Sequence, residues 1–347
     1  MSRNLGVQPG CSDFGVTAEG ERAVEIVLVG DSGATISIVS YGARIRSLKV
    51  PDERDGRGSY EAVLGYSDLA SYLRDPLYAG AVVGRVAGRI VGGEFLLDNR
   101  LVSLHVNNSG NCLHGGGYFD RAVWEVEGYS REAARLSYVS PDGEGGFPGE
   151  VTVQVTYYVT PDDTVRIEYD AVTTRPTPLS LTQHTYFNLS GNLEHRVLDH
   201  QVWVDSKRFV PVDLNLTPLD RVESVTGGLD LQTPRSVATV AKASTLGHGE
   251  LYQIAGEPGT LRRVAGVRCP SKARSLEVWS TQPYLQLFTG SMIPRVSEEV
   301  LGRAVKPFVG LSLECQGYPN GINAPRLGDI TLCPGDRYRE ITEWRFS

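Results

Sequence analysis

The chain has 347 residues with a formal net charge of −7, and 41% of its residues are hydrophobic. An acidic chain lacks the basic excess of a nucleic-acid-binding protein, so we expect no such partner. The five cysteines are odd in number, widely spaced and without a C-x-x-C pair, which argues against a disulfide framework or a cysteine zinc site. No apolar run approaches the ~18 residues of a membrane span, and the N-terminus carries no signal-peptide core. We therefore expect a cytoplasmic protein without membrane contact.

Short alternating runs, separated by Gly, Asp and Pro, follow the first twenty residues, which are Gly-rich and polar and are expected to be loosely ordered. These runs predict strands at 23–29, 34–39, 45–50, 151–159, 165–169, 276–280 and 284–289. Helical periods are scarce, with one short candidate at 67–74. Many short strands without a linker or repeat indicate one all-β domain over residues 1–347, built as a sandwich or barrel-like stack of sheets.

Two stretches carry polar residues on one face of an expected strand. In Leu179–Gly191 that face holds His184 and Tyr186, and in Gly310–Gln316 it holds Glu314. Such a face is often the solvated side of an antiparallel sheet. The alternative is a cleft for a polyhydroxy ligand, in which the histidine and the glutamate supply an acid and a base.

Three further segments are weak signals when taken singly: V-G-R-V-A-G-R-I at 83–90, L-H-G-G-G at 113–117 and Q-P-Y-L-Q-L-F-T-G at 282–290. Arg89 could pair with a surface carboxylate, as most arginines do. His114 could be a turn residue bonded to a backbone carbonyl, and Gln286 could face solvent from a strand.

Taken together and in order, these motifs resemble the aldose 1-epimerases, or galactose mutarotases. The resemblance also covers P-D-G-E-G-G-F-P-G-E at 141–150, Q-H-T-Y-F-N-L-S-G at 183–191, L-E-C-Q-G-Y-P at 313–319 and P-G-D-R-Y at 334–338. It runs from about Val39 to the C-terminus. It implies a large antiparallel β-sandwich that binds a sugar in an open cleft over one sheet.

The resemblance also implies roles for individual residues. Glu314 matches the catalytic base and His184 the catalytic acid, whereas Arg89, His114, Tyr186 and Gln286 match sugar-binding positions. Ring opening needs a proton taken from the C1 hydroxyl and one given to the ring oxygen, and a carboxylate and an imidazolium suit these tasks. No cofactor is needed, and a metal at His114, His184 and Glu314 is disfavoured because the resemblance gives all three metal-free roles.

Several positions depart from the family pattern. Gly88 replaces an asparagine, Gly249 aligns with a sugar-binding aspartate, and Tyr284 replaces a glycine near the cleft. Glu250 is one position away from the missing aspartate, which in a strand reverses its face. These changes predict that galactose and glucose are poor substrates and that the true ligand is less hydroxylated, or bulkier where Gly249 leaves room.

Three interpretations remain open on the sequence. The chain is an enzyme that interconverts the anomers of a sugar, a mutarotase-fold isomerase, cyclase or lyase acting on a modified sugar or natural-product intermediate, or a non-catalytic carbohydrate-binding protein. A sugar-phosphate variant of the first would need basic residues at the cleft rim, for which Arg262, Arg263 and Arg295 are candidates. The partner is a small sugar or sugar-like molecule, and a monomer or homodimer is expected.

Overall fold

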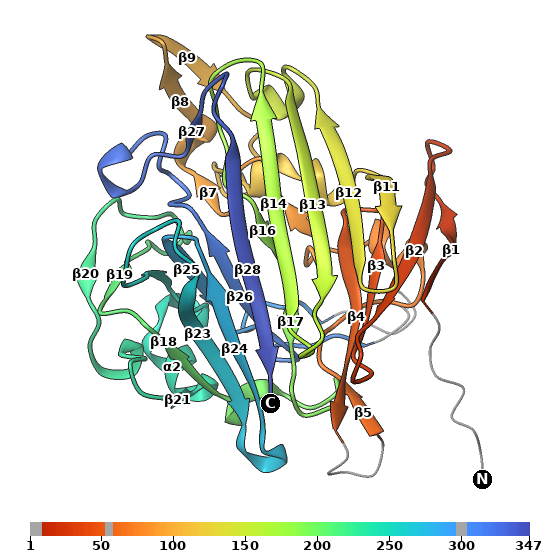
Figure 1. Cartoon of the computed structure of the whole chain (residues 1–347). Coiled ribbons are helices and arrows are strands. Elements are labelled where there is room, and N and C mark those ends of the chain that lie inside the picture. The colour runs from red at the N-terminus through yellow and green to blue at the C-terminus, as the bar shows by residue number, and fades with distance from the viewer. Residues whose placement is uncertain (1–8, 53–57, 296–303) are drawn as a thin grey trace.

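The computed structural model of the protein describes residues 9–52, 58–295 and 304–347. Every pairing between its strands is antiparallel, and three sheets dominate (Figure 1). The first is a five-stranded meander of β1 (Gly10–Val16), β2 (Arg22–Val29), β3 (Thr35–Val39), β4 (Arg44–Asp52) and β5 (Gly58–Glu61).

The largest sheet has nine strands and gives the molecule one broad face. In spatial order it contains β11 (Glu125–Tyr129), β12 (Ala133–Ser140), β13 (Val151–Val159), β14 (Val165–Thr173), β28 (Tyr338–Phe346), β24 (Arg274–Ser280), β23 (Arg262–Cys269), β18 (Gln201–Val204) and β21 (Arg235–Ser236). The alternating V-T-V-Q-V-T-Y-Y-V run forms β13 over its full length, as the sequence predicts.

A six-stranded sheet lies behind the long strands β14 and β28 in Figure 1. Its order is β17 (Tyr186–Phe187), β26 (Leu311–Gln316), β25 (Tyr284–Phe288), β22 (Leu251–Gln253), β19 (Arg208–Val210) and β20 (Glu223–Ser224). The main core contains buried residues of all three sheets, among them Ile38, Val155 and Leu313. This arrangement confirms the expected all-β antiparallel sandwich, since two sheets must cover each other's apolar faces.

The remaining elements are short. Four two-stranded pairs join β6 (Val82–Val83) with β16 (Thr182–Gln183), β7 (Arg89–Ile90) with β10 (Cys112–Leu113), β8 (Glu94–Leu97) with β9 (Arg100–Ser103), and β15 (Thr177–Pro178) with β27 (Thr331–Leu332). The α-helices in the described ranges are α1 (Leu69–Leu73), which lies inside the predicted segment 67–74, and α2 (Val237–Ala243). No helix in the described ranges is long and apolar enough to cross a membrane.

Two expectations about local order are wrong. Gly10–Val16 is a strand rather than loose chain, because it pairs along β2 at the edge of the five-stranded sheet; residues 1–8 lie outside the described part. Leu179–Gly191 is not one strand, because β16 pairs with β6 whereas β17 pairs with β26. The chain changes partners at His184 and Thr185, and this break sets the position of the histidine.

Candidate functional site

One pocket of about 200 Å³ contains all six residues singled out from the sequence. The six come from segments far apart in the chain, and they meet where β26 and β25 face the turn between β16 and β17. They are Arg89, His114, His184, Tyr186, Gln286 and Glu314.

The floor of the pocket is set by the register of β26. Leu313 points into the main core, so its neighbours Ser312 and Glu314 point the other way. Glu314 lies directly opposite Gln286 of β25, and Ser312 lies opposite Tyr186 of β17. The predicted alternation of this strand is therefore confirmed, and it brings three of the expected site residues together.

His184 enters from the turn where the chain changes sheets. Its backbone N–H donates to Ala81, and its carbonyl accepts from Gly80, which holds the turn against the strand β6 region. The His184 Nε2 atom lies 3.6 Å from the nearer carboxylate oxygen of Glu314. The two side chains are only 6% and 3% exposed, so this acid–base pair is shielded from bulk water.

The β7–β10 pair places Arg89 and His114, because Leu113 lies opposite Arg89. The backbone N–H of Gly88 donates to Nδ1 of His114 at 3.1 Å. An N–H group can only donate, so neutral His114 carries its own proton on Nε2 and is a hydrogen-bond donor. Arg89 uses its Nε–H group to bond Asn108, which orients the guanidinium.

Burial controls the protonation of the central pair. It raises the pKa of Glu314 to about 8, opposed by the positive charge of Arg89. Burial also lowers the pKa of His184 to about 4, and holds that of His114 well below its ordinary value. Between pH 4 and pH 8 the two side chains therefore share one proton. It resides on Glu314, because a low-dielectric site disfavours both the carboxylate and the imidazolium.

Gly249 leaves no room in the pocket, so the expectation of space there for a bulkier ligand is wrong. Its φ is +103°, and a Cβ there would lie 2.2 Å from the carbonyl oxygen of Leu287. Glu250 does not replace the missing aspartate either: its carboxylate is buried outside the pocket and accepts from the N–H of Thr245. Tyr284 is also outside the pocket lining; it packs on Tyr318.

His248 is the side chain that this segment contributes to the pocket, and sequence reasoning missed it. Its ring packs on Phe288 with centroids 4.8 Å apart, and its Nδ1 lies 3.3 Å from the carbonyl oxygen of Gly249. A carbonyl only accepts, so Nδ1 donates and Nε2 of the neutral ring is an acceptor. The signal was a histidine directly before Gly249 in a segment already matched to a sugar-binding motif.

Two further pocket residues were also not assigned a role from sequence. Tyr78 packs edge-on against His114 with ring centroids 4.8 Å apart, and lies near His184 as well. Gln316 follows Glu314 by two positions on the same face of β26. Spacing could not find Tyr78, because it reaches the site from an irregular segment, whereas the alternation that puts Glu314 on this face of β26 also puts Gln316 there.

A metal ion has three possible ligands here, since atoms of His114, His184 and Glu314 lie within 4.8 Å of one another. His114, however, has Nδ1 occupied by the Gly88 N–H and a proton on Nε2. Ligation would require it to give up one of these, which leaves two ready ligands. The donor set therefore fits a zinc-type site poorly.

The comparisons with known proteins agree with this architecture. The aldose 1-epimerase family profile matches residues 25–345. The galactose mutarotase of Sus scrofa is 36% identical over 346 residues, covering 97% of this chain and 98% of its own. The galactose mutarotase of Homo sapiens is 35% identical, covering 96% and 97%.

Solved structures give the same result. An aldose epimerase homologue from C. elegans superposes with a TM-score of 0.85 at 25% identity, covering 94% of this chain and 99% of its own. The galactose 1-epimerase of Lactobacillus acidophilus, at 23% identity, shares the fold with a TM-score of 0.84 over 99% of both chains. With nearly its whole length matched in sequence and in fold, the protein belongs to the aldose 1-epimerase family of isomerases.

Proposed function

We propose that this protein interconverts the α and β anomers of a free aldohexose by acid–base ring opening and closure at His184 and Glu314. The observation that carries the proposal is this buried pair, 3.6 Å apart, in a pocket whose other polar side chains are neutral except for one arginine. Because pig and human relatives are galactose mutarotases, galactose is the first candidate substrate.

The reaction moves two protons and leaves no net change in the enzyme. With Glu314 as carboxylate and His184 as imidazolium, Glu314 takes the proton of the C1 hydroxyl while His184 protonates the ring oxygen. The C1–O5 bond breaks, C1 becomes a carbonyl, and the C1–C2 bond rotates. Closure on the other carbonyl face returns both protons, so each group acts once as acid and once as base.

Burial of the pair stabilises the state in which the sugar is open and both side chains are neutral. Ring opening converts a charged pair into a neutral one, and burial favours the neutral state because it raises the pKa of Glu314 and lowers that of His184. Proton transfer from the closed ring needs the charged state of the pair. The bound sugar and Arg89 must then replace water as the groups that stabilise the Glu314 carboxylate. The site thus offsets part of the instability of the open-chain intermediate.

The remaining groups divide into donors and acceptors for sugar hydroxyls. Arg89 and the Nε2–H of His114 donate, and the Nε2 of His248 accepts. Gln286 gives one amide N–H to the Leu287 carbonyl, which leaves its carbonyl oxygen and its second N–H for a ligand. Such an array holds the sugar in one orientation while the proton transfers occur.

The structure changes the substrate expectation. Galactose and glucose were expected to be poor substrates because Gly249 lacks an acceptor, but His248 supplies a neutral acceptor from the adjacent position. The rim arginines proposed for a phosphate do not support that variant. Arg262 bonds backbone carbonyls and Arg263 pairs with Asp205, and neither they nor Arg295 line the pocket. Neither a changed reaction nor a non-catalytic role is favoured by the comparisons.

The test is the rate of anomer equilibration of freshly dissolved α-galactose and α-glucose, followed by polarimetry or NMR. A specificity constant of about 10⁴ M⁻¹s⁻¹ or above for either sugar is expected. A rate no higher than that of the same solution without protein, for both sugars, would contradict the proposal. Dialysis against a strong chelator should leave the rate unchanged, and a stoichiometric metal required for turnover would reverse the metal-free assignment.

Other parts of the expectation stay predictions. The cytoplasmic location, the lack of nucleic-acid partners and the monomeric or homodimeric state belong to this proposal and await fractionation and sedimentation measurements.

A further inference from the structure

Gln316 lines the pocket on the same strand as Glu314 and has no task in the proposed reaction. On this face of β26, Ser312 donates its hydroxyl to the Thr185 carbonyl, and Glu314 belongs to the acid–base pair. Gln316 is only 1% exposed and lines the same pocket. Its Oε1 atom is buried and has no hydrogen-bond partner among the described residues.

An unpartnered buried amide oxygen is unfavourable in an empty site, and native proteins rarely keep one without a reason. The amide of Gln316 lies beside Gly88, which also lines the pocket. A Cβ at Gly88 would lie 3.3 Å from the Gln316 Nε2 atom and 2.7 Å from the Pro319 ring. The carboxamide of Gln316 therefore occupies the space beside Gly88 that a longer side chain at position 88 would need.

We propose that Gln316 is a substrate-binding residue whose Oε1 accepts the proton of a sugar hydroxyl. The inference rests on the proposed function and extends it. Two positions along a strand separate Gln316 from Glu314 by about 6.6 Å between Cα atoms. Because Glu314 acts at the C1 hydroxyl, Gln316 recognises a different hydroxyl of the same ring. The amide absent at Gly88 is thereby supplied from β26.

The experiment compares Gln316→Met with wild type and with a matched control. Methionine keeps the length of the side chain and removes the strong acceptor. The control is Gln282→Met: Gln282 is also buried, but its amide donates to the hydroxyl of Tyr338 outside the pocket. Dissociation constants for galactose and for its 2-, 3-, 4- and 6-deoxy analogues are measured by NMR titration, together with KM, kcat and Tm.

Gln316→Met is expected to weaken galactose binding about 5-fold or more, with the same rise in KM and with kcat within about twofold. One deoxy analogue should bind wild type and Gln316→Met equally, which identifies the hydroxyl. Tm should not fall in Gln316→Met, whereas Gln282→Met should lose stability and keep wild-type binding. Unchanged galactose binding, as expected if only a water bonds Oε1, would overturn the proposal. So would weaker binding with every deoxy analogue affected equally.

The two proposals fail separately because binding is measured without turnover. If Glu314→Gln keeps full activity while Gln316→Met weakens binding, the acid–base assignment is wrong and the Gln316 inference stands. If Glu314→Gln abolishes turnover while Gln316→Met binds galactose as wild type does, only the Gln316 inference is wrong.

Discussion

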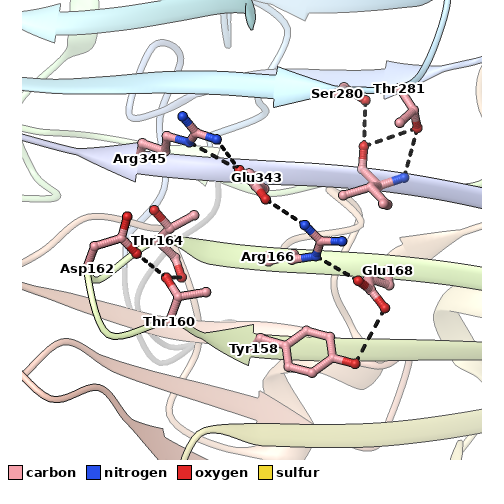
Figure 2. Close-up of polar contacts among 11 residues, drawn as sticks. Tyr158, Thr160, Asp162, Thr164, Arg166, Glu168, Ser280, Thr281, Glu343 and Arg345 are labelled. Atoms are coloured by element: carbon pink, nitrogen blue, oxygen red, sulfur yellow. Dashed lines mark hydrogen bonds and ion pairs between the residues drawn. The ribbon is translucent and has the colours of Figure 1, made fainter. Parts of the chain in front are cut away.

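Two rows of polar side chains cross neighbouring strands in this protein, and they differ in how their polar groups are paired. The first lies on the outer face of the nine-stranded sheet, across β13, β14 and β28 (Figure 2). Arg166 bonds both Glu168 and Glu343, and Arg345 bonds Glu343 from the other side. At the end of this row, the hydroxyl of Tyr158 donates to Glu168. Each carboxylate here has an arginine.

The second row is the pocket floor, where the groups are more deeply buried but less well paired. Glu314 has no arginine within salt-bridge distance among the described residues, and its nearest ionic partner is His184 at 3.6 Å. The Nδ1 of His184 and the Oε1 of Gln316 have no partner among those residues. Paired polar groups on a solvated face stabilise the sheet modestly, whereas unpaired groups in a buried pocket are available to a ligand.

The largest test of this contrast is the removal of the pocket acid–base pair. Glu314→Gln and His184→Asn should each lower turnover by about 10²-fold or more, because each removes one proton transfer. Galactose binding should change far less, since both replacements keep a polar group that can form hydrogen bonds at the same position. Near-normal turnover in either variant, measured by polarimetry, would mean that the pair does not carry the reaction. Glu168→Gln on the outer row is the control and should leave turnover unchanged.

The pH profile should report the pocket pair and not the outer row. The pair holds one proton between the lowered pKa of His184, about 4, and the raised pKa of Glu314, about 8. A second proton below pH 4 removes the base, and loss of the shared proton above pH 8 removes the acid. We expect kcat/KM to be bell-shaped and to fall about tenfold per pH unit beyond each limb. A profile still rising through pH 9, or one shifted by Glu168→Gln, would contradict this.

Gly249→Asp should damage the fold rather than restore sugar binding. The left-handed backbone strains any side chain, and the Cβ meets the Leu287 carbonyl at 2.2 Å, so a loss of about 2–4 kcal/mol in the free energy of unfolding is expected. Gly259→Asp is the matched control, because Gly259 also has a positive φ but faces open space. Denaturant melts compare the two. A stable Gly249→Asp with faster galactose turnover would show that the segment repositions.

The smallest expected effect, with opposite signs for the two rows, is on stability. The pKa of Glu314 is raised in the fold, so at pH 7 the unfolded chain ionises this carboxyl and the folded chain does not. Glu314→Gln should therefore stabilise the protein by about 1–3 kcal/mol at pH 7, and by little at pH 4. Glu343→Gln should destabilise it by about 1 kcal/mol, since two arginines lose their partner. Thermal melts at both pH values show whether each variant is more or less stable than wild type. A change in the same direction for both variants would contradict the contrast between the two rows.

Much of the fold follows from local pattern. The alternation of β13 and β26 was predictable because one face of each strand meets the apolar core. The six candidate site residues were singled out through their motifs, and all six line one pocket. The pairing of Gly10–Val16 was not predictable, since a polar edge strand carries little apolar signal. The substitution at Gly249 was misread, because a sequence gives neither φ nor the nearby Leu287 carbonyl.

The sequence by itself determined which side chains alternate along each strand and which chemistry the motifs could perform. It did not determine which polar face would be solvated, because Gln154 beside Val155 and Glu314 beside Leu313 follow the same alternation. That was decided by long-range pairing: Tyr186 lies opposite Ser312, and this register brings His184 next to Glu314. Burial of that pair, and with it the shift of both pKa values, arises only when sheets distant in the chain close over it.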